Sequence, residues 1–280
     1  MGKESFGLSY LKHNLRRFVF IANRLLRKYT KSKRQAQIAK TIANDLGVHP
    51  DIHPDDFIFQ FLIDNPCFSK PEEAIHYYFN DGRKSTNILA ALVKELGLPD
   101  SFSLLEFASG YGCVSRHFPV VMPCAKVTTC DIHVGAVDFM SATLGMNAVI
   151  SNSVPENIDL PENYDVIFSL SFFSHMPRQT WGRWLVAHFS QLKPGGALIF
   201  TTQGLESRKY FGFPEIPLDG FWYRAESEQY DLDTAEYGST IVTRAFVENE
   251  VRQQIRRPIH LYRQGFWWKH QDLYVVRKPS

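Results

Sequence analysis

The sequence predicts an α/β fold with a doubly wound, mainly parallel sheet. From residue 103 onward, short apolar runs typical of buried strands alternate with segments of helical periodicity. Strands separated by helices form parallel βαβ units, which assemble into one sheet covered by helices on both faces. The expected strands lie at 103–107, 125–130, 148–151, 165–171 and 197–202. The expected helices lie before and between them, at 71–82, 85–97, 113–121, 134–144 and 179–192.

The C-terminal part predicts further strands and one more helix. A strand at 239–243 and a helix at 245–256 are followed by two β-rich runs, at 259–262 and 272–277. The two runs are typical of a terminal hairpin. If the first of them runs parallel to the other strands, the turn at 265–272 lies beside their carboxyl ends.

The N-terminal part differs in composition from the rest. We expect residues 1–70 to be a basic helical extension and residues 71–280 to be the main domain, with an insertion at about 203–240 that could act as a lid or bind a substrate. Apolar residues in 5–29 recur at steps of three and four, which predicts an amphipathic helix. The polar stretch 30–46 and the prolines after it predict a linker or a packed irregular segment.

The net charge of +2 is unevenly distributed. Residues 1–40 contain eleven lysines and arginines and one acid, which leaves 20 basic and 28 acidic residues in the rest of the chain. An acidic main domain is a poor match for a polyanion, so we expect no nucleic-acid partner. The basic helix at 5–29 can pack on the protein or a partner subunit, which we favour, or lie on an anionic membrane surface.

Composition also indicates the compartment. No apolar run reaches the roughly 20 residues that span a bilayer, and no signal peptide is evident. We therefore expect a cytoplasmic protein, with peripheral contact at the inner membrane surface as an alternative. The four cysteines lack the paired spacing of a metal site, so we expect reduced thiols and no bound metal. They are Cys67, Cys113, Cys124 and Cys130.

Polar and small residues gather where the expected strands end. Ligands of doubly wound sheets bind at the carboxyl ends of the strands, so these positions form the candidate site. The first strand carries Glu106 and leads into a small-residue loop, 108–112, while Asp131 follows the second strand. Glycine lets a loop approach a ligand closely, and a carboxylate at the second position can accept hydrogen bonds from both hydroxyls of a ribose. The later strand ends carry Ser151, Asn152 and Ser153, and then the run 169–175.

Four motifs, in this order, resemble those of the class I S-adenosylmethionine-dependent methyltransferases. The first motif of that family is matched by LLEFASGYG, the second by TTCDIH, the fourth by YDVIFSLSFFSHMP and the fifth by LKPGGALIFTT. The resemblance covers residues 75–205. It implies a Rossmann-like methyltransferase fold with a seven-stranded sheet, methyltransferase activity and S-adenosyl-L-methionine as the cofactor. The terminal hairpin would form the sixth and seventh strands.

The resemblance also implies roles for individual residues. Glu106 and the loop would hold the methionine part of the cofactor, Asp131 would hold the ribose, and Ile132 would pack on the adenine. Asn152, where the family frequently has an aspartate, would face the adenine edge. Ala108 stands where the family has its first glycine. The expected cofactor-binding residues are Glu106, Ala108, Ser109, Gly110, Gly112, Asp131, Ile132, Asn152, Ser153, Ser169, Leu170 and Ser171.

Other interpretations of these residues remain open. Glu106 could cap the following helix, and Asp131 could be a solvated loop acid. Their joint position at neighbouring strand ends favours the cofactor. A nicotinamide dinucleotide fingerprint would need a glycine at Ser115, so a dinucleotide-dependent enzyme is the weaker alternative. A non-catalytic binding or scaffold protein with this fold is the other alternative.

The acceptor is predicted mainly by exclusion. The SLSFF run after the fourth strand lacks the Pro-Pro motif of nucleobase N-methylating enzymes and the Pro-Cys nucleophile of cytosine C5 enzymes. A small-molecule or saccharide acceptor therefore remains. His175 is the expected general base because it follows the fourth strand, although it could instead pack against the next helix. Aromatic residues in 203–240 and 265–272 are the expected acceptor contacts.

Overall fold

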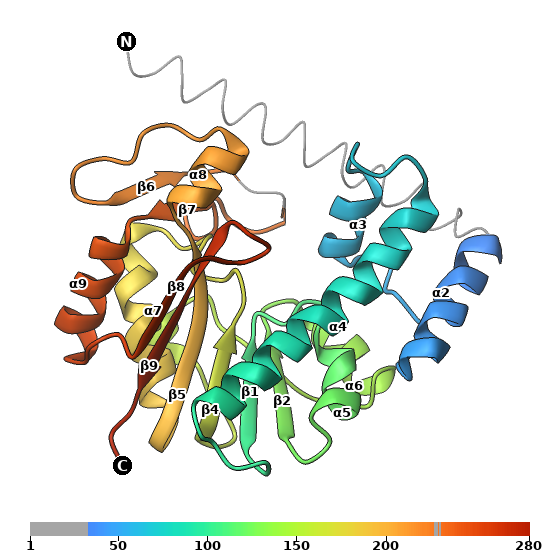
Figure 1. The fold of residues 1–280 in the computed structure, drawn as a ribbon, viewed down its shortest axis with the longest axis horizontal. Helices are drawn as coiled ribbons and strands as arrows, with labels where there is room; N and C mark the ends of the chain where they lie inside the picture. The colour runs from blue at the N-terminus through green and yellow to red at the C-terminus, as the bar shows by residue number, and fades with distance from the viewer. Residues whose placement is uncertain (1–32, 227–228, 230) are drawn as a thin grey trace.

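Seven strands form one central sheet in this computed structural model, which describes residues 33–226, 229 and 231–280. They are β1 (Ser103–Phe107), β2 (Lys126–Asp131), β3 (Asn147–Ile150), β4 (Tyr164–Ser169), β5 (Leu192–Gln203), β8 (Leu261–Trp267) and β9 (Gln271–Arg277). Their order is β3-β2-β1-β4-β5-β9-β8. β1 to β5 pair in parallel, whereas β9 is antiparallel to both β5 and β8. β8 therefore runs parallel to β1–β5, and the turn that follows it lies at their carboxyl ends (Figure 1).

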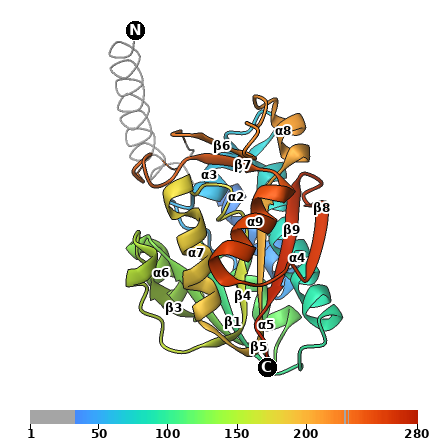
Figure 2. The same ribbon diagram turned by 90° about the vertical axis from the view of Figure 1, so that its left-hand side faces the viewer.

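Helices cover both faces of this sheet. The helices of the described residues are α2 (Lys33–Leu46), α3 (Phe57–Ile63), α4 (Pro71–Glu95), α5 (Phe118–Val121), α6 (Val134–Ala142), α7 (Arg178–Ser190), α8 (Leu205–Phe211) and α9 (Arg244–Ile255), with single 3-10 turns η1 (Ser115–His117) and η2 (Pro155–Asn157). α2 and α3 pack on α4 and not on the sheet. α4 and α5 pack on one face, and α7 and α9 pack on the other (Figure 1, Figure 2). The insertion holds α8 and a two-stranded antiparallel sheet, β6 (Phe221–Arg224) and β7 (Ser239–Val242), at the end of the molecule where the parallel strands finish.

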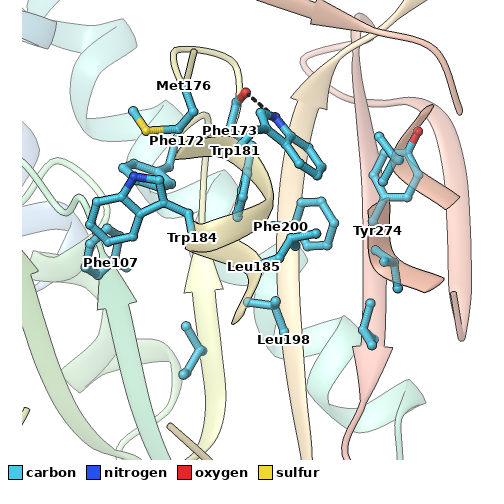
Figure 3. Packing of buried hydrophobic residues seen from close by; sticks show 14 of the residues in the cluster. Phe107, Phe172, Phe173, Met176, Trp181, Trp184, Leu185, Leu198, Phe200 and Tyr274 are labelled. Atoms are coloured by element: carbon cyan, nitrogen blue, oxygen red, sulfur yellow. Dashed lines mark hydrogen bonds between the residues drawn. The ribbon is translucent and has the colours of Figure 1, made fainter. Parts of the chain in front are cut away.

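Successive side chains of a strand point to opposite faces of the sheet, so the core around the sheet has an apolar cluster on each face. Leu198 and Phe200 of β5 point into the cluster on the α7 side, and Ile199 points into the cluster on the α4 side. Figure 3 shows Phe200 packed with Trp181 of α7 and Phe173. The indole Nε1 of Trp181 donates to the Phe173 carbonyl at 3.1 Å. This bond pairs the buried indole N–H and fixes the loop after β4 on α7.

The structure corrects the expected secondary structure near the N-terminus. The segment between 30 and 66, expected to be irregular, contains α2 and α3, because Ile42 and its neighbours on α2 pack into an apolar cluster with α4. The two helices expected at 71–82 and 85–97 are one helix, α4, since nothing between them breaks a helix. The helix expected at 113–121 is split into η1 and α5, because Pro119 cannot donate the hydrogen bond that would continue η1.

The basic amphipathic helix predicted at 5–29 lies outside the described residues. Over the part of the chain that the structure describes, no helix is both long enough and apolar enough to cross a bilayer.

Candidate active site

Positive φ angles shape the loop after β1, at Ala108 (58°), Gly110 (56°) and Gly112 (78°). A Cβ at Gly112 would lie 2.6 Å from Met140 Sδ and 2.5 Å from Leu144 Cδ1, so this glycine is needed for the loop to pack against α6. A Cβ at Gly110 would meet no described atom within 4 Å. Gly110 therefore presents its backbone to open space, where a ligand can approach closely.

The Asp131 carboxylate is tied to this loop. The Gly110 backbone N–H donates to Asp131 Oδ2 at 2.7 Å, and the backbone N–H and Nδ1 of His133 lie 3.0 and 2.8 Å from Oδ1. Asp131 is 6% exposed. A carboxylate offers about four acceptor positions, so three contacts still leave capacity for a ribose hydroxyl. The structure thus brings together the two strand ends that the sequence predicts to hold the cofactor.

His133 continues this network into the insertion, since its Nε2 lies 3.4 Å from Asp231 Oδ2. Burial alone would lower the pKa of His133, but its hydrogen bonds to Asp131 and Asp231 and their charges raise this pKa to about 10. The ring is therefore a cation at neutral pH. Its contribution to stability is fully present below the ordinary histidine pKa of 6.5 and is lost as the pH rises toward 10.

The N-terminal helices also reach the loop. Arg116 of η1 is buried, and its Nη1 donates to the carbonyls of His49 at 3.0 Å and Asp51 at 2.8 Å. The ring of His53 stacks on Tyr111 of the loop, with 4.5 Å between centroids. The segment that leads into α3 is therefore fixed against the candidate cofactor loop.

Glu106 is 3% exposed and accepts a hydrogen bond from the Ser115 hydroxyl. Burial raises the pKa of Glu106 to about 8; the Ser115 hydrogen bond opposes this shift and the charge of Asp131 adds to it. Glu106 is therefore mainly neutral at pH 7 in the protein without ligand.

We expect this buried carboxyl to make stability pH-dependent. The native protein keeps the Glu106 proton up to about pH 8, whereas the unfolded chain loses it near pH 4.5, so stability falls as the pH rises between these values. At about 1.36 kcal/mol per unit, the wild type should lose about 2 kcal/mol between pH 6.5 and 8 that Glu106→Gln does not lose. Urea unfolding of both proteins at the two pH values measures this difference, and parallel losses would contradict the assignment.

The predicted adenine contacts lie at the ends of β2 and β3, which are neighbours in the sheet. Ile132 is 37% exposed, so its apolar side chain is available to a ligand. Ser153 is exposed. The Asn152 Oδ1 accepts from the backbone N–H of Val154 at 2.9 Å, a local turn that uses part of its acceptor capacity. The roles of these residues toward adenine stay predictions.

The three predicted residues after β4 differ in placement. Ser169 is completely buried, with its hydroxyl 3.5 Å from His188 Nδ1 inside the fold, and Leu170 packs partly into the α4-side cluster. Ser171 has a φ of 60°, its backbone N–H donates to Thr201 Oγ1, and its hydroxyl accepts from Gln271 Nε2, both at 2.8 Å. Ser171 therefore joins the ends of β4, β5 and β9, whereas the Ser169 side chain belongs to the core.

Two residues of the insertion hold the His175 side chain in place. Its Nδ1 lies 2.8 Å from the Gly238 carbonyl, and its ring stacks on Tyr237 with 4.4 Å between centroids and a 4° interplanar angle. A carbonyl can only accept, so Nδ1 carries the proton and, in the neutral ring, Nε2 carries the lone pair. This is the tautomer that a general base acting through Nε2 requires.

Comparisons with known proteins decide the family. A family model described as "Methyltransferase domain" matches residues 104–196, about a third of the chain, including the loop after β1, Asp131 and β4. This part of the chain is a class I methyltransferase domain. The match confirms the predicted family, enzyme class and cofactor, S-adenosyl-L-methionine, which is the methyl donor of this family. No curated protein sequence matches the chain.

Solved structures confirm the fold class of this methyltransferase. A S-adenosylmethionine-dependent methyltransferase from Clostridium acetobutylicum has a TM-score of 0.52 at 13% identity, over 72% of this chain and 92% of that chain. An amino pentose methyltransferase from Micromonospora echinaspora, solved with its donor bound, has a TM-score of 0.52 at 15% identity, over 75% and 98%. Magnesium protoporphyrin IX methyltransferase from Synechocystis has a TM-score of 0.52 at 11% identity, over 79% and 92%.

Some residues of this methyltransferase site escape sequence reasoning. Arg116 donates from Nε to the Gly112 carbonyl of the loop after β1 at 2.8 Å, and His133 contacts Asp131; no sequence pattern marks either residue. In the sequence, Ser115 counts only as evidence against a dinucleotide site. The structure shows that its hydroxyl is the hydrogen-bond partner of Glu106, nine residues earlier. Within the described residues, no cluster of three or more histidines, cysteines and acids could hold a metal ion.

Proposed function

We propose that the protein transfers the methyl group of S-adenosyl-L-methionine to a small-molecule or saccharide acceptor. The observation that carries this proposal is the unit formed by Gly110 and Asp131. It places an open glycine backbone and an oriented, almost buried carboxylate side by side at the ends of β1 and β2. These are the groups that an adenosine moiety needs, so the residues present fit the cofactor.

The cofactor supplies an already activated methyl group, and the protein positions the reactants. Asp131 would hold the ribose, and the loop from Ala108 to Gly112 would hold the methionine part. Positioning alone can remove about 7–11 kcal/mol from a barrier between two bound reactants. For a hydroxyl acceptor, His175 would take the proton at Nε2, while its Nδ1 stays bonded to the Gly238 carbonyl.

The general acceptor class is supported by fold relatives. Two of the relatives described above act, by their descriptions, on an amino pentose and on magnesium protoporphyrin IX, both small molecules. The aromatic residues of the insertion and the hairpin turn, which lie at the carboxyl ends of the strands, agree with a compact organic acceptor.

Titration of the protein with S-adenosylhomocysteine tests the donor half of the proposal. We expect measurable heat with the wild type and a roughly 10- to 150-fold weaker affinity for Asp131→Ala, since a hydrogen bond to a charged group contributes about 1.5–3 kcal/mol. Asp138→Ala, at an exposed position of α6, is the matched control and should bind as the wild type does. Absence of heat with the wild type would refute the proposal. Equal affinities for the two variants would remove Asp131 from the ribose site.

The cytoplasmic location and the contact of residues 5–29 with a membrane surface stay predictions. If the contact exists, deleting residues 1–32 should abolish co-sedimentation with vesicles that contain anionic lipid, because the deletion removes most of the excess positive charge. Unchanged co-sedimentation would show that this segment has another role.

A further inference from the structure

Asp81 of α4 is a carboxylate held in an unusual setting. The indole Nε1 of Trp268 lies 2.9 Å from Asp81 Oδ1 and 3.0 Å from Oδ2. Among the described residues, no lysine or arginine nitrogen lies within ion-pair distance of this carboxylate, and Lys84, one turn further along α4, acts on it only through its charge. Burial raises the pKa of Asp81, while Trp268, Lys84 and Tyr77 oppose the shift. The carboxylate is thus partly desolvated and lacks a close cation.

A row of stacked aromatic rings begins at the indole that bonds Asp81. Trp268 stacks with His270 with 6.1 Å between centroids, and His270 stacks with Tyr210 at 5.1 Å and 16°. Burial and the charge of Asp81 raise the pKa of Tyr77 to about 12. Tyr77 is 41% exposed and Tyr210 is 71% exposed, so both rings are accessible to a ligand. We call Asp81, Tyr77, Tyr210, Trp268 and His270 the Asp81 cluster.

The Asp81 cluster is connected to the donor site. The Ser207 hydroxyl of α8 donates to the His270 carbonyl at 2.7 Å, and the next residue, Gln271, donates to Ser171 at the end of β4. On the other side, Gly82, the neighbour of Asp81 in α4, packs directly on Cys113, the residue that follows the loop after β1: a Cβ at Gly82 would lie 2.1 Å from the Cys113 carbonyl oxygen. The cluster therefore lies beside the loop that would hold the methionine part of the donor and beside the end of β4.

We propose that the Asp81 cluster binds an amino group of the acceptor, so that the acceptor is a ring compound that carries an amine. This inference rests on the proposed function and specifies its substrate class. A partly desolvated carboxylate without a close lysine or arginine among the described residues, next to a row of stacked rings, matches an ammonium group. The ammonium gains an ionic hydrogen bond to the carboxylate and cation–π attraction from the exposed rings. A hydroxyl would supply neither the charge nor the attraction to the rings. Burial lowers the pKa of His270, so its neutral ring does not compete for the carboxylate.

Ligand-observed NMR on the protein saturated with S-adenosylhomocysteine tests this inference, with benzylamine and benzyl alcohol as matched probes at pH 7. We expect the wild type to bind benzylamine at least fivefold more tightly than benzyl alcohol. Asp81→Asn keeps the shape and can still accept from Trp268, and it should abolish this preference. Asp100→Asn, at an exposed position beyond the other end of α4, is the matched control and should keep it.

Tyr210→Ala supplies an independent variant, because this exposed ring can be removed with little effect on folding. It should weaken benzylamine binding at least threefold, even if Asp81→Asn fails to fold. Equal binding of the two probes by the wild type, binding of neither, or an amine preference that survives in both variants would overturn the inference. Binding of S-adenosylhomocysteine is measured first, so its failure identifies failure of the proposed function, whereas intact binding without an amine preference refutes only the Asp81 cluster.

Discussion

Gly82→Ala is expected to lower the free energy of unfolding by about 3 kcal/mol and to weaken binding of S-adenosylhomocysteine. A Cβ at this position of α4 would lie 2.1 Å from the Cys113 carbonyl oxygen and 2.9 Å from His117 Cδ2. The carbonyl belongs to the backbone just after the cofactor loop, so it cannot move without moving the loop. Replacing an ordinary glycine inside a helix by alanine raises the free energy of unfolding by about 1 kcal/mol. Gly82→Ala is therefore expected to change this free energy in the opposite direction.

Gly182→Ala in α7 is the matched control for this prediction. Its Cβ would meet only flexible side-chain atoms, 2.6 Å from Glu250 Oε2 and 3.0 Å from Gln254 Cδ, and these can rotate away. We therefore expect its unfolding free energy to stay within about 1 kcal/mol of the wild type. Chemical denaturation and calorimetric titration measure both effects. A Gly82→Ala protein as stable as Gly182→Ala would contradict the close contact between α4 and the loop.

His175→Gln is expected to lower kcat about 100-fold for a hydroxyl acceptor and to change the acceptor KM little, since general-base catalysis contributes roughly that much. Glutamine can still donate to the Gly238 carbonyl but cannot take a proton, so the local hydrogen bond is kept while the ring that stacks on Tyr237 is lost. Steady-state kinetics with labelled donor measure kcat and KM.

The alternative to this role is a packing role, in which His175 only connects the loop after β4 to the insertion. Tyr237→Leu removes the stacked ring but leaves the imidazole, and it is the control for disturbed packing. If His175→Gln keeps kcat, or if Tyr237→Leu loses as much activity, His175 does not act as a base.

The strands and loops that are expected to hold the methyl donor could be predicted because they depend on local sequence. Strands β1 to β5 appear as short apolar runs, and each run ends close to where the observed strand ends. Gly110 and Asp131 follow strand ends, so the general rule for parallel sheets was enough to place them together. Ala108 at a positive φ also agrees with the position where the family has a glycine.

The other parts of the candidate site depend on contacts between residues far apart in the chain, and a single sequence does not reveal such contacts. The bond of His133 to Asp231 joins residues almost a hundred positions apart, and Trp268 reaches Asp81 across 187 positions. The single helix α4 was expected as two, because a Gly-Arg-Lys-Ser stretch looks like a break although Gly82 is there for close packing. The sequence also does not reveal that strand alternation turns the Ser169 side chain toward α7, while its role toward the cofactor stays a prediction.

The strand order has a consequence for how this enzyme could diversify. The expected donor contacts come from one continuous stretch, 106–171, whereas the Asp81 cluster is assembled from α4, α8 and the turn after β8. Because β8 runs parallel to β1–β5 and β9 returns antiparallel between β5 and β8, the turn between β8 and β9 lies at the carboxyl ends of the parallel strands, beside residues encoded far earlier. Mutations could therefore remodel the acceptor side while leaving the donor side untouched, so relatives of this chain can share a donor and differ in what they methylate.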